Sequence, residues 1–375
     1  MPDLHFETSE PLTLGIEEEF VLVDAGDGVT PAPRAEELLD GEVQTIASPG
    51  GWFKPELLRT SIELTTAANR DLLQVDVDLR ALRDELVRRC DDLGIAACGI
   101  GMHPTQVASD AEVTSSDAHR AIADLHGRVG TLGEQVTHGI HVHVGMPSLD
   151  DAIRVMDALA GCVPLFIALT ANSPLAEGRV APWRSARSEV LRRMLWAGVT
   201  PRFRDVDEYR AVHALHQLEN SGDQRFLWEV APVPALGTVE VRSFDANPDA
   251  DVALAMATLV QAIAAMVLDG HELARGNDSL ERHNRWSAME FGPRARFLVV
   301  GHDEPVDVAD LVRALVERVR SYARDLGSED WLEPIEGLLT HPPTDRVLDA
   351  FAEGGAAAAL AECRVTAGAT DHAGA

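Results

Sequence analysis

The sequence predicts an α+β fold in which a sheet carries helices on one side. Six short segments rich in valine, isoleucine and leucine have the length and composition of strands, and four longer ones have helical periodicity. Two strand segments nearly adjoin late in the chain, an irregular order that favours α+β over a doubly wound fold. The strand segments are Leu14–Val23, Ser61–Thr66, Ile95–Ile100, Ile140–Val144, Phe226–Val230 and Thr238–Phe244, and the helical segments are Leu72–Leu93, Asp150–Leu169, Ala250–Leu268 and Val306–Leu326.

The chain of 375 residues can bury a substantial core. It shows no fixed repeat and no long linker, so we expect one domain over residues 11–360. The end of the chain is rich in glycine and alanine, and we expect residues 361–375 to form a disordered tail. Val252–Leu268 is apolar enough to suggest a membrane span, but Gln261 interrupts it, which favours a buried core helix.

Composition limits the cellular compartments and the binding partners that we expect for this chain. The first ten residues are acidic and polar, so neither a signal nor a transit peptide is expected and the cytoplasm is the expected location. Four widely spaced cysteines form no CxxC pair, which argues against disulfides or structural zinc. A net charge of −29 makes nucleic acid and anionic membranes poor partners.

Lysine is nearly absent. Lys54 is the single lysine among 32 basic residues, and it follows no GxxxxGK pattern, which excludes a P-loop. Any nucleotide phosphate must therefore be held by arginine, metal ions or backbone N–H groups.

The first two expected strands carry acidic residues. Alternation places Glu17 and Glu19 on one face of the first strand, opposite Ile16 and Phe20. Two carboxylates aimed at one point repel unless a cation lies between them, and oxygen ligands suit Mg²⁺. A solvated acidic edge is the competing interpretation. Glu63 stands in an otherwise apolar strand, which alone is a weak signal.

Two later strands add histidine and arginine. His141 and His143 share a face in the segment HGIHVHV, an arrangement for metal or phosphate, with zinc left open by this motif alone. Glu240 and Arg242 share a face opposite two valines, which places a carboxylate beside a guanidinium that can clamp a phosphoryl group. A simple salt bridge is the alternative for that pair.

Considered together, the four strands favour a functional site over separate structural charges. Each has an apolar face and a polar face that carries acid, histidine or arginine, so a sheet built from them presents one concave polar surface. Phosphoryl transfer from a metal nucleotide needs such a surface, with cations around the phosphates and donors aimed at the transferred group.

With these motifs the sequence resembles the glutamate–cysteine ligase type 2 family, a bacterial carboxylate–amine ligase branch. The resemblance runs from about Thr13 to about Gly292. It is carried by TLGIEEEFVLVD (13–24), LLRTSIELTT (57–66), GIHVHVG (139–145), ANSPLAEG (171–178) and EVRSFDANP (240–248).

The resemblance implies a glutamine synthetase-like catalytic fold, with a curved, mainly antiparallel sheet and helices packed on its outer side. It implies ATP and Mg²⁺ as cofactors, with Mn²⁺ as an alternative, and a homodimer by analogy. The implied metal ligands are Glu17, Glu19, Glu63, Glu240 and His141. His141, His143 and Arg242 would contact the nucleotide phosphates. Arg242 and Arg184 would act in catalysis, Arg242 at the γ-phosphoryl and Arg184 near the amino-acid carboxylate or phosphate.

The implied reaction joins the γ-carboxylate of L-glutamate, or a similar carboxylate, to an amine such as L-cysteine through an acyl phosphate. Three arginines typical of the branch are replaced here by Ala231, Ser287 and Glu290. This loss suggests a changed carboxylate–amine pair or weak activity. Two further alternatives are metal-dependent hydrolysis and an ATP-binding relative kept for regulation.

Overall fold

The computed structural model describes residues 4–39, 44–46, 50–107, 112–115, 120, 123–124, 136–194, 196–219, 226–273 and 275–367. Within these residues the largest sheet has eight strands in the order β11-β12-β6-β1-β4-β3-β2, and β5 pairs with β1. Every neighbouring pair in it is antiparallel. Its strands are β1 (Leu14–Asp24), β2 (Gln44–Ile46), β3 (Gly51–Pro55), β4 (Ser61–Thr66), β5 (Ile95–Cys98), β6 (Gly139–Gly145), β11 (Val230–Val233) and β12 (Thr238–Asp245).

Three pairs of two-residue strands lie outside this sheet: β7 (Leu175–Ala176) with β8 (Arg179–Val180), β9 (Ala197–Gly198) with β10 (Leu227–Trp228), and β13 (Arg296–Phe297) with β14 (Val306–Asp307). The helices are α1 (Ala35–Leu38), α2 (Leu72–Leu93), α4 (Leu149–Thr170), α5 (Ala186–Leu191), α6 (Val206–Glu219), α7 (Ala250–Leu268), α8 (Asp278–Phe291), α9 (Val308–Asp325), α10 (Pro334–Thr340) and α11 (Pro343–Glu362), with 3₁₀ turns η3 (Gly292–Arg294) and η4 (Glu329–Leu332).

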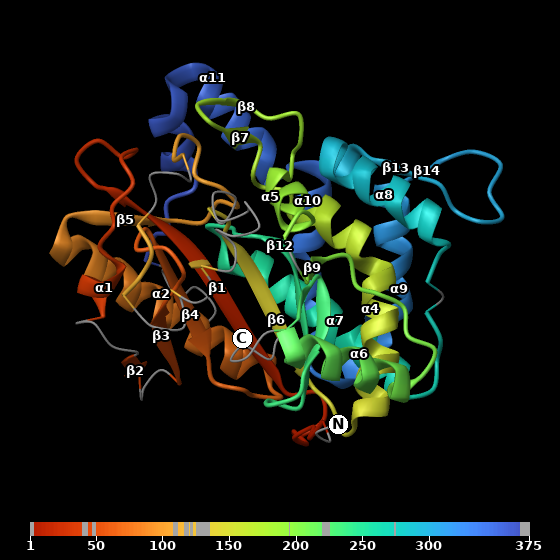
Figure 1. The fold of residues 1–375 in the computed structure, drawn as a ribbon. Coiled ribbons are helices and arrows are strands. Elements are labelled where there is room, and N and C mark those ends of the chain that lie inside the picture. The colour runs from red at the N-terminus through yellow and green to blue at the C-terminus, as the bar shows by residue number, and fades with distance from the viewer. Residues whose placement is uncertain are drawn as a thin grey trace.

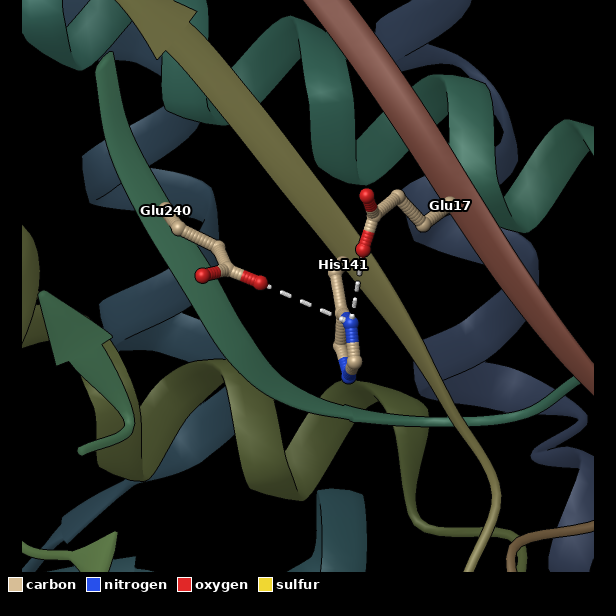
Figure 2. A group of neighbouring side chains, drawn as sticks. All are labelled: Glu17, His141 and Glu240. Atoms are coloured by element: carbon tan, nitrogen blue, oxygen red, sulfur yellow. Dashed lines mark hydrogen bonds and ion pairs between the residues drawn. The ribbon is translucent and has the colours of Figure 1, made fainter. Parts of the chain in front are cut away.

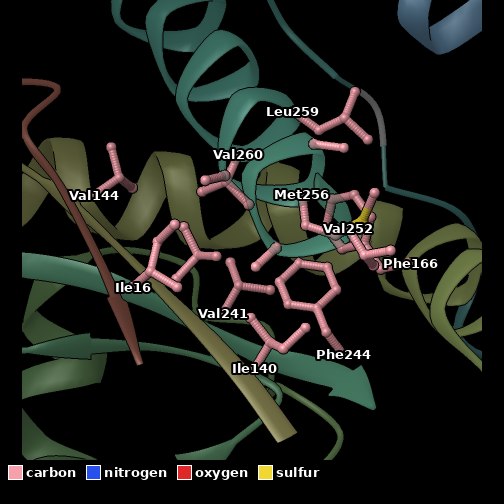
Figure 3. Close-up of a cluster of buried hydrophobic side chains, with 14 of the residues drawn as sticks. Ile16, Ile140, Val144, Phe166, Val241, Phe244, Val252, Met256, Leu259 and Val260 are labelled. Carbon is pink, nitrogen blue, oxygen red and sulfur yellow. The ribbon is translucent and has the colours of Figure 1, made fainter. Parts of the chain in front are cut away.

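Helices α2, α4 and α7 cover one face of the large sheet, as Figure 1 shows. Figure 3 shows the packing at this interface, where Ile16, Ile140 and Val241 of three adjacent strands meet Phe166 of α4 and Met256 of α7. All of these side chains are buried, and burial of such apolar area is the main stabilising term of a fold. The helix layer leaves the opposite face of β1, β4, β6 and β12 for polar side chains.

The predicted elements are largely confirmed. Helix α2 has the predicted bounds, and Ser148 caps α4 as expected, because its Oγ accepts the Asp151 N–H at 3.1 Å. The segment Phe226–Val230 differs: it divides between β10, which pairs outside the large sheet, and β11, which forms one edge of it. Helix α9 begins at Val308, two residues later than predicted, because Val306 and Asp307 form β14 and pair with β13.

The expected disordered tail is wrong for its first residues. Helix α11 continues to Glu362, and Cys363 and Val365 are buried. The Val365 N–H donates to the carbonyl of Ala97 at 2.9 Å, which ties the chain to β5. Residues 368–375 lie outside the described residues. Sequence composition missed this contact because alanine and glycine permit close helix packing as readily as they permit disorder.

Among the described residues, two helices, α4 and α7, are long and apolar enough to cross a membrane by length and composition alone. Both are mostly buried inside the fold, where they pack on the sheet and on each other. This position agrees with the core-helix interpretation of Val252–Leu268. The four cysteines are free and buried.

Candidate functional site

The site lies on the face of the sheet opposite α2, α4 and α7. Strand register places Glu17 of β1 across from His141 of β6, and His143 across from Glu240 of β12. On the other side of β1, Glu19 lies across from Glu63 of β4. The two-residue periodicity of strands therefore brings all of these polar side chains to one surface, as the sequence predicted.

Glu17, His141 and Glu240 form the first group of possible metal ligands, shown in Figure 2. His141 Nδ1 lies 3.3 Å from an oxygen of Glu17 and 3.6 Å from one of Glu240. His143 reaches the same two carboxylates through its Nε2, at 3.6 and 3.5 Å. One ligand atom from each of Glu17, His141 and Glu240 can lie within 4.8 Å of the others, so one ion could contact all three.

Glu19, Glu56 and Glu63 form the second group with this spacing. Glu56 was missed from the sequence because it follows β3 rather than lying in a predicted strand. Lys54 was also missed, although it is the lone lysine: its Nζ lies 2.5 Å from Glu63 and 3.3 Å from Glu17. Pairing of β3 with β4 places Lys54 directly across from Glu63.

The electrostatics of this face are strongly perturbed. Burial opposes ionisation of Glu17, but hydrogen bonds from His141 and His143 outweigh it, so its pKa lies well below the ordinary value. Burial likewise opposes ionisation of Glu240, and Arg242 and His143 lower its pKa. For Glu63, burial and then the charge of Glu17 raise the pKa well above the ordinary value.

The cations respond in the opposite sense. Burial tends to lower the pKa of His143, but the charge of Glu240 and a hydrogen bond to Glu17 raise it to about 10. Burial also opposes the charge on Lys54, and its pKa is raised because Glu63 and Glu17 stabilise the ammonium form. Nearby charges outweigh desolvation at both groups.

The residues present fit a bound metal ion. Glu240 Oε1 and His143 Nε2 are buried and lie 3.5 Å apart, and Oε1 also lies 3.0 Å from the Arg242 guanidinium, so among the described residues they make ion pairs without a well-aligned hydrogen bond. Five carboxylates, those of Glu17, Glu19, Glu56, Glu63 and Glu240, crowd this face against few cations. A donor set of many oxygens and one or two imidazoles suits Mg²⁺ or Mn²⁺ better than a thiolate-preferring metal.

Arg242 extends this face toward the end of β12. A β-bulge places Arg242 and Ser243 together opposite His141, and the guanidinium lies 3.0 Å from Glu240. Bulges re-aim side chains next to active sites. Here the bulge keeps Arg242 on the polar face and returns Phe244 to the core.

The structure separates Arg184 from the other predicted site residues. Its guanidinium donates to Asp345 of α11 at 3.3 Å, and among the described residues it makes no contact with the polar face. Arg187, three residues later, approaches the site instead. Its guanidinium is buried, donates to the carbonyl of Arg242 at 3.1 Å and interacts electrostatically with Glu19. The APWRSAR segment contained this signal, but composition could not choose between its arginines.

Gly139 explains how Arg187 fits. A Cβ atom at Gly139 would lie 2.0 Å from Nη2 of Arg187, so only glycine leaves room for the guanidinium. The Gly139 N–H also donates to Glu19 at 2.6 Å and fixes that carboxylate. The start of β6 therefore positions one cation and one anion of the site.

The three positions where the family resemblance leads us to expect arginine lie in different places. Ala231 of β11 is buried directly across from Glu240, so an arginine there would adjoin the first carboxylate group. Ser287 donates to the carbonyl of Arg296 at 3.1 Å and serves α8 packing. Glu290 lines a pocket of about 340 Å³ that also contains Arg184.

Glu18, the middle residue of the EEE run, points to the helix face. It is 1% exposed and accepts two hydrogen bonds from Arg83 of α2, at 2.7 and 2.5 Å. Arg83 also donates to the carbonyl of Pro248 at 2.6 Å. Glu18 is thus a buried structural anion, a role that no sequence argument had supplied.

Comparisons with known proteins agree with this geometry. The sequence model of "Glutamate-cysteine ligase family 2(GCS2)" matches residues 13–362. A relative from Rubrobacter xylanophilus, with the provisional name glutamate–cysteine ligase 2-3, is 34% identical over 338 residues, which are 89% of this chain and 90% of that protein. A relative from Gloeobacter violaceus, with the provisional name glutamate–cysteine ligase 2, is 31% identical over 340 residues, 89% of this chain and 90% of that protein.

Solved structures share the fold at low identity. Glutamate–cysteine ligase from Francisella tularensis in complex with AMP aligns with a TM-score of 0.63 at 15% identity, covering 96% of this chain and 89% of that one. A bifunctional glutathione synthetase from Pasteurella multocida aligns with a TM-score of 0.62 at 16% identity, covering 94% of this chain and 52% of that one. The expected glutamine synthetase-like α+β fold with an antiparallel sheet is confirmed.

Proposed function

This chain belongs to glutamate–cysteine ligase family 2 and is a carboxylate–amine ligase similar to glutamate–cysteine ligase; we propose that it uses ATP and Mg²⁺ to form an amide bond through an acyl phosphate. One observation carries the proposal. Five carboxylates, two histidines, two arginines and Lys54 converge on one side of the sheet, in two groups whose ligand atoms are spaced for a metal ion.

We assign metal binding to two groups. Glu17, His141 and Glu240 form the first, and Glu19, Glu56 and Glu63 form the second. Bound Mg²⁺ neutralises phosphate charge and polarises the P–O bonds of the nucleotide. The spacing of the carboxylates supports this assignment, because at such distances they repel one another, and Lys54, His143 and Arg242 offset only part of that repulsion.

The protein's own cations hold the phosphates. Arg242 and Arg187 present guanidinium groups at the β12 end of the polar face, where planar donors suit a phosphoryl group. His143, whose pKa is raised to about 10, adds a positive charge beside Glu240. We give Arg187 the anion-binding role that the sequence had suggested for Arg184.

The reaction then has two steps. An oxygen of the substrate carboxylate attacks the γ-phosphorus of ATP, the bond to the β,γ-bridging oxygen breaks, and ADP leaves. The amine nitrogen next attacks the carbonyl carbon of the acyl phosphate, the C–O bond to phosphate breaks, and the nitrogen loses a proton. Activation is needed because a carboxylate is a poor acylating agent.

A second candidate is a ligase for a pair other than glutamate and cysteine. Ala231 removes a cation directly across from Glu240, and Glu290 reverses a charge in the pocket beside Arg184. Both changes alter how anionic groups would be held. They favour substrates with fewer carboxylates or with an additional cation.

ADP formation by the purified chain with ATP, Mg²⁺ and L-glutamate, with and without L-cysteine, tests the proposal. We expect amine-dependent ADP release that is lost in Glu19→Gln. A panel of other carboxylates and amines distinguishes the two candidates. Amide hydrolysis without nucleotide would instead establish a metal hydrolase, and tight ATP binding with no turnover on any pair would establish an inactive relative.

A further inference from the structure

We propose that the pocket between the β7–β8 hairpin, the end of α8 and α11 binds the amine substrate, with Glu290 holding its ammonium group. That the bound amine is a substrate rests on the proposed ligase function, whereas its binding can be measured independently of that function. These three elements adjoin one another in Figure 1, and each contributes residues to the pocket wall. The amine class inferred is a primary amine with an apolar body.

The walls of the pocket are mainly apolar. Pro174, Trp183, Phe291 and Leu348 line it, and its volume of about 340 Å³ lies at the small end for ligand sites. Phe291 remains 44% exposed, so the mouth presents an aromatic ring to an entering molecule. Aromatic and proline side chains provide a surface for a hydrocarbon body, and the aromatic rings can also attract a cation.

The polar groups of the pocket divide into paired and unpaired ones. Arg294 donates two hydrogen bonds to Asp345, at 3.0 and 2.5 Å, and Arg184 donates one at 3.3 Å. Glu290 has a buried Oε2 with no hydrogen-bond partner, and among the described residues it makes no ion pair. The arginines are thus engaged with Asp345, and the carboxylate is the group that lacks a counterion.

A buried carboxylate oxygen without a partner is costly, and a bound ammonium would supply both charge and hydrogen bonds. The lining holds Arg184 and Arg294 as well as Glu290, so an anionic group would be repelled by Glu290 and would lie near the arginines instead. The pocket therefore suits an ammonium group on its Glu290 side. It does so at a position where an arginine is expected from the family resemblance, which gives this chain a different preference.

The pocket is attached to the site through β12. The carbonyl of Arg184 accepts the Ser173 N–H at 3.0 Å, and Ser173 Oγ donates to Asp245 at 2.7 Å. Asp245 is the last residue of β12, the strand that carries Glu240 and Arg242. An occupied pocket thus adjoins the segment that ends the polar face.

Calorimetry with the purified full chain tests binding without nucleotide. The probes are L-leucine, which carries a carboxylate, and 3-methylbutylamine, which carries the same apolar body without one. We expect at least one to bind and its Kd to rise about tenfold or more in Glu290→Gln, because a charge-assisted hydrogen bond is lost. Glu353→Gln, at an exposed glutamate of α11, is the matched control and should leave Kd unchanged.

Two results overturn the inference: neither probe binds, or the Kd in Glu290→Gln equals that of the wild type. Glu290→Arg, which restores the arginine expected from the family resemblance, should also abolish binding of 3-methylbutylamine. In turnover assays, Glu290→Gln should raise the KM for the amine and leave the KM for ATP unchanged. Amine binding that depends on Glu290 without any ADP release would support the amine site and refute the ligase function. Failure of the inference and failure of the proposed function can therefore be told apart.

Discussion

Consecutive glutamates of β1 occupy two different environments. Glu18 faces the helices and is matched by Arg83, which gives it two hydrogen bonds within a fully packed core. Glu17 and Glu19 face the other side, where five carboxylates share four cationic side chains, those of Lys54, His143, Arg187 and Arg242. The difference teaches that the local balance of charge, rather than burial, distinguishes a structural carboxylate from one that can take a metal ion.

The largest effect should come from breaking the matched pair. Arg83→Leu leaves the Glu18 carboxylate buried without a cation, and we expect it to lower the free energy of unfolding by about 3–5 kcal/mol. Urea denaturation followed by circular dichroism measures this. The double variant Glu18→Leu/Arg83→Leu should recover much of the loss, since no charge is then left unpaired. A loss below about 1 kcal/mol in the single variant would show that Glu18 and Arg83 are not the structural pair described.

Glu17→Gln should affect turnover more than stability. Turnover should fall about a hundredfold or more, the upper end of what is seen around metal sites, because a ligand of the first group is lost. Stability should fall by less than in Arg83→Leu: ionised Glu17 is stabilised by His141, His143 and Lys54, which hold its pKa low, but these groups keep neighbouring carboxylates as partners in the variant. Parallel measurements of kcat and Tm check both halves. A variant that keeps its turnover but loses stability would reverse the roles assigned to Glu17 and Glu18.

Two glycines, one at the start of β6 and one on β1, allow a test of how the backbone positions the polar face. Gly139→Ala would place a Cβ on the Arg187 guanidinium, and we expect a loss of about 1–3 kcal/mol together with reduced turnover. Gly15→Ala is the matched control on β1, because its Cβ would meet only ordinary contact at 3.8 Å from His143. Equal behaviour of the two variants would refute the claim that Gly139 positions Arg187.

The smallest effect concerns a buried histidine near this face. Burial lowers the pKa of His103 to about 4, and its Nδ1 accepts the N–H groups of Thr105 and Gln106, which further disfavours a proton there. The unfolded chain protonates near pH 6.5, so between pH 6.5 and 4 it binds more protons and stability falls as pH decreases.

At pH 5.5 this linkage should lower the free energy of unfolding by about 1 kcal/mol relative to pH 7.5. His103→Asn keeps an acceptor but cannot titrate, so chemical denaturation at the two pH values should show a smaller difference in the variant. The same pH dependence in wild type and variant would assign the effect to other groups, such as His138, whose pKa burial lowers to about 3.

The sequence predicted the polar face well because strand alternation is strictly local. Glu17, Glu19, Glu63, His141, His143, Glu240 and Arg242 all lie where a two-residue period places them. It missed Lys54 and Glu56, because β3 is short and its position beside β4 depends on long-range pairing. It also favoured Arg184 over Arg187, a choice that depends on how the segment folds over Gly139.

Glu18 shows the same limit in another form. Its partner Arg83 lies 65 residues away on α2, and nothing in the spacing of the EEE run points to it. Composition also suggested a disordered tail where Cys363 and Val365 are buried beside β5. Local sequence patterns predict which face of a strand a side chain lies on, whereas tertiary contacts determine which charged groups form ion pairs.

Calorimetric titration of Mg²⁺ into the wild-type chain and Glu240→Gln tests the central claim most directly, since that claim is that the crowded carboxylates of the polar face hold a divalent cation. The account predicts that the wild type binds Mg²⁺, with a matching rise in Tm, and that Glu240→Gln weakens binding about tenfold or more. Equal Mg²⁺ affinity in the two proteins, or no binding by the wild type, would contradict it.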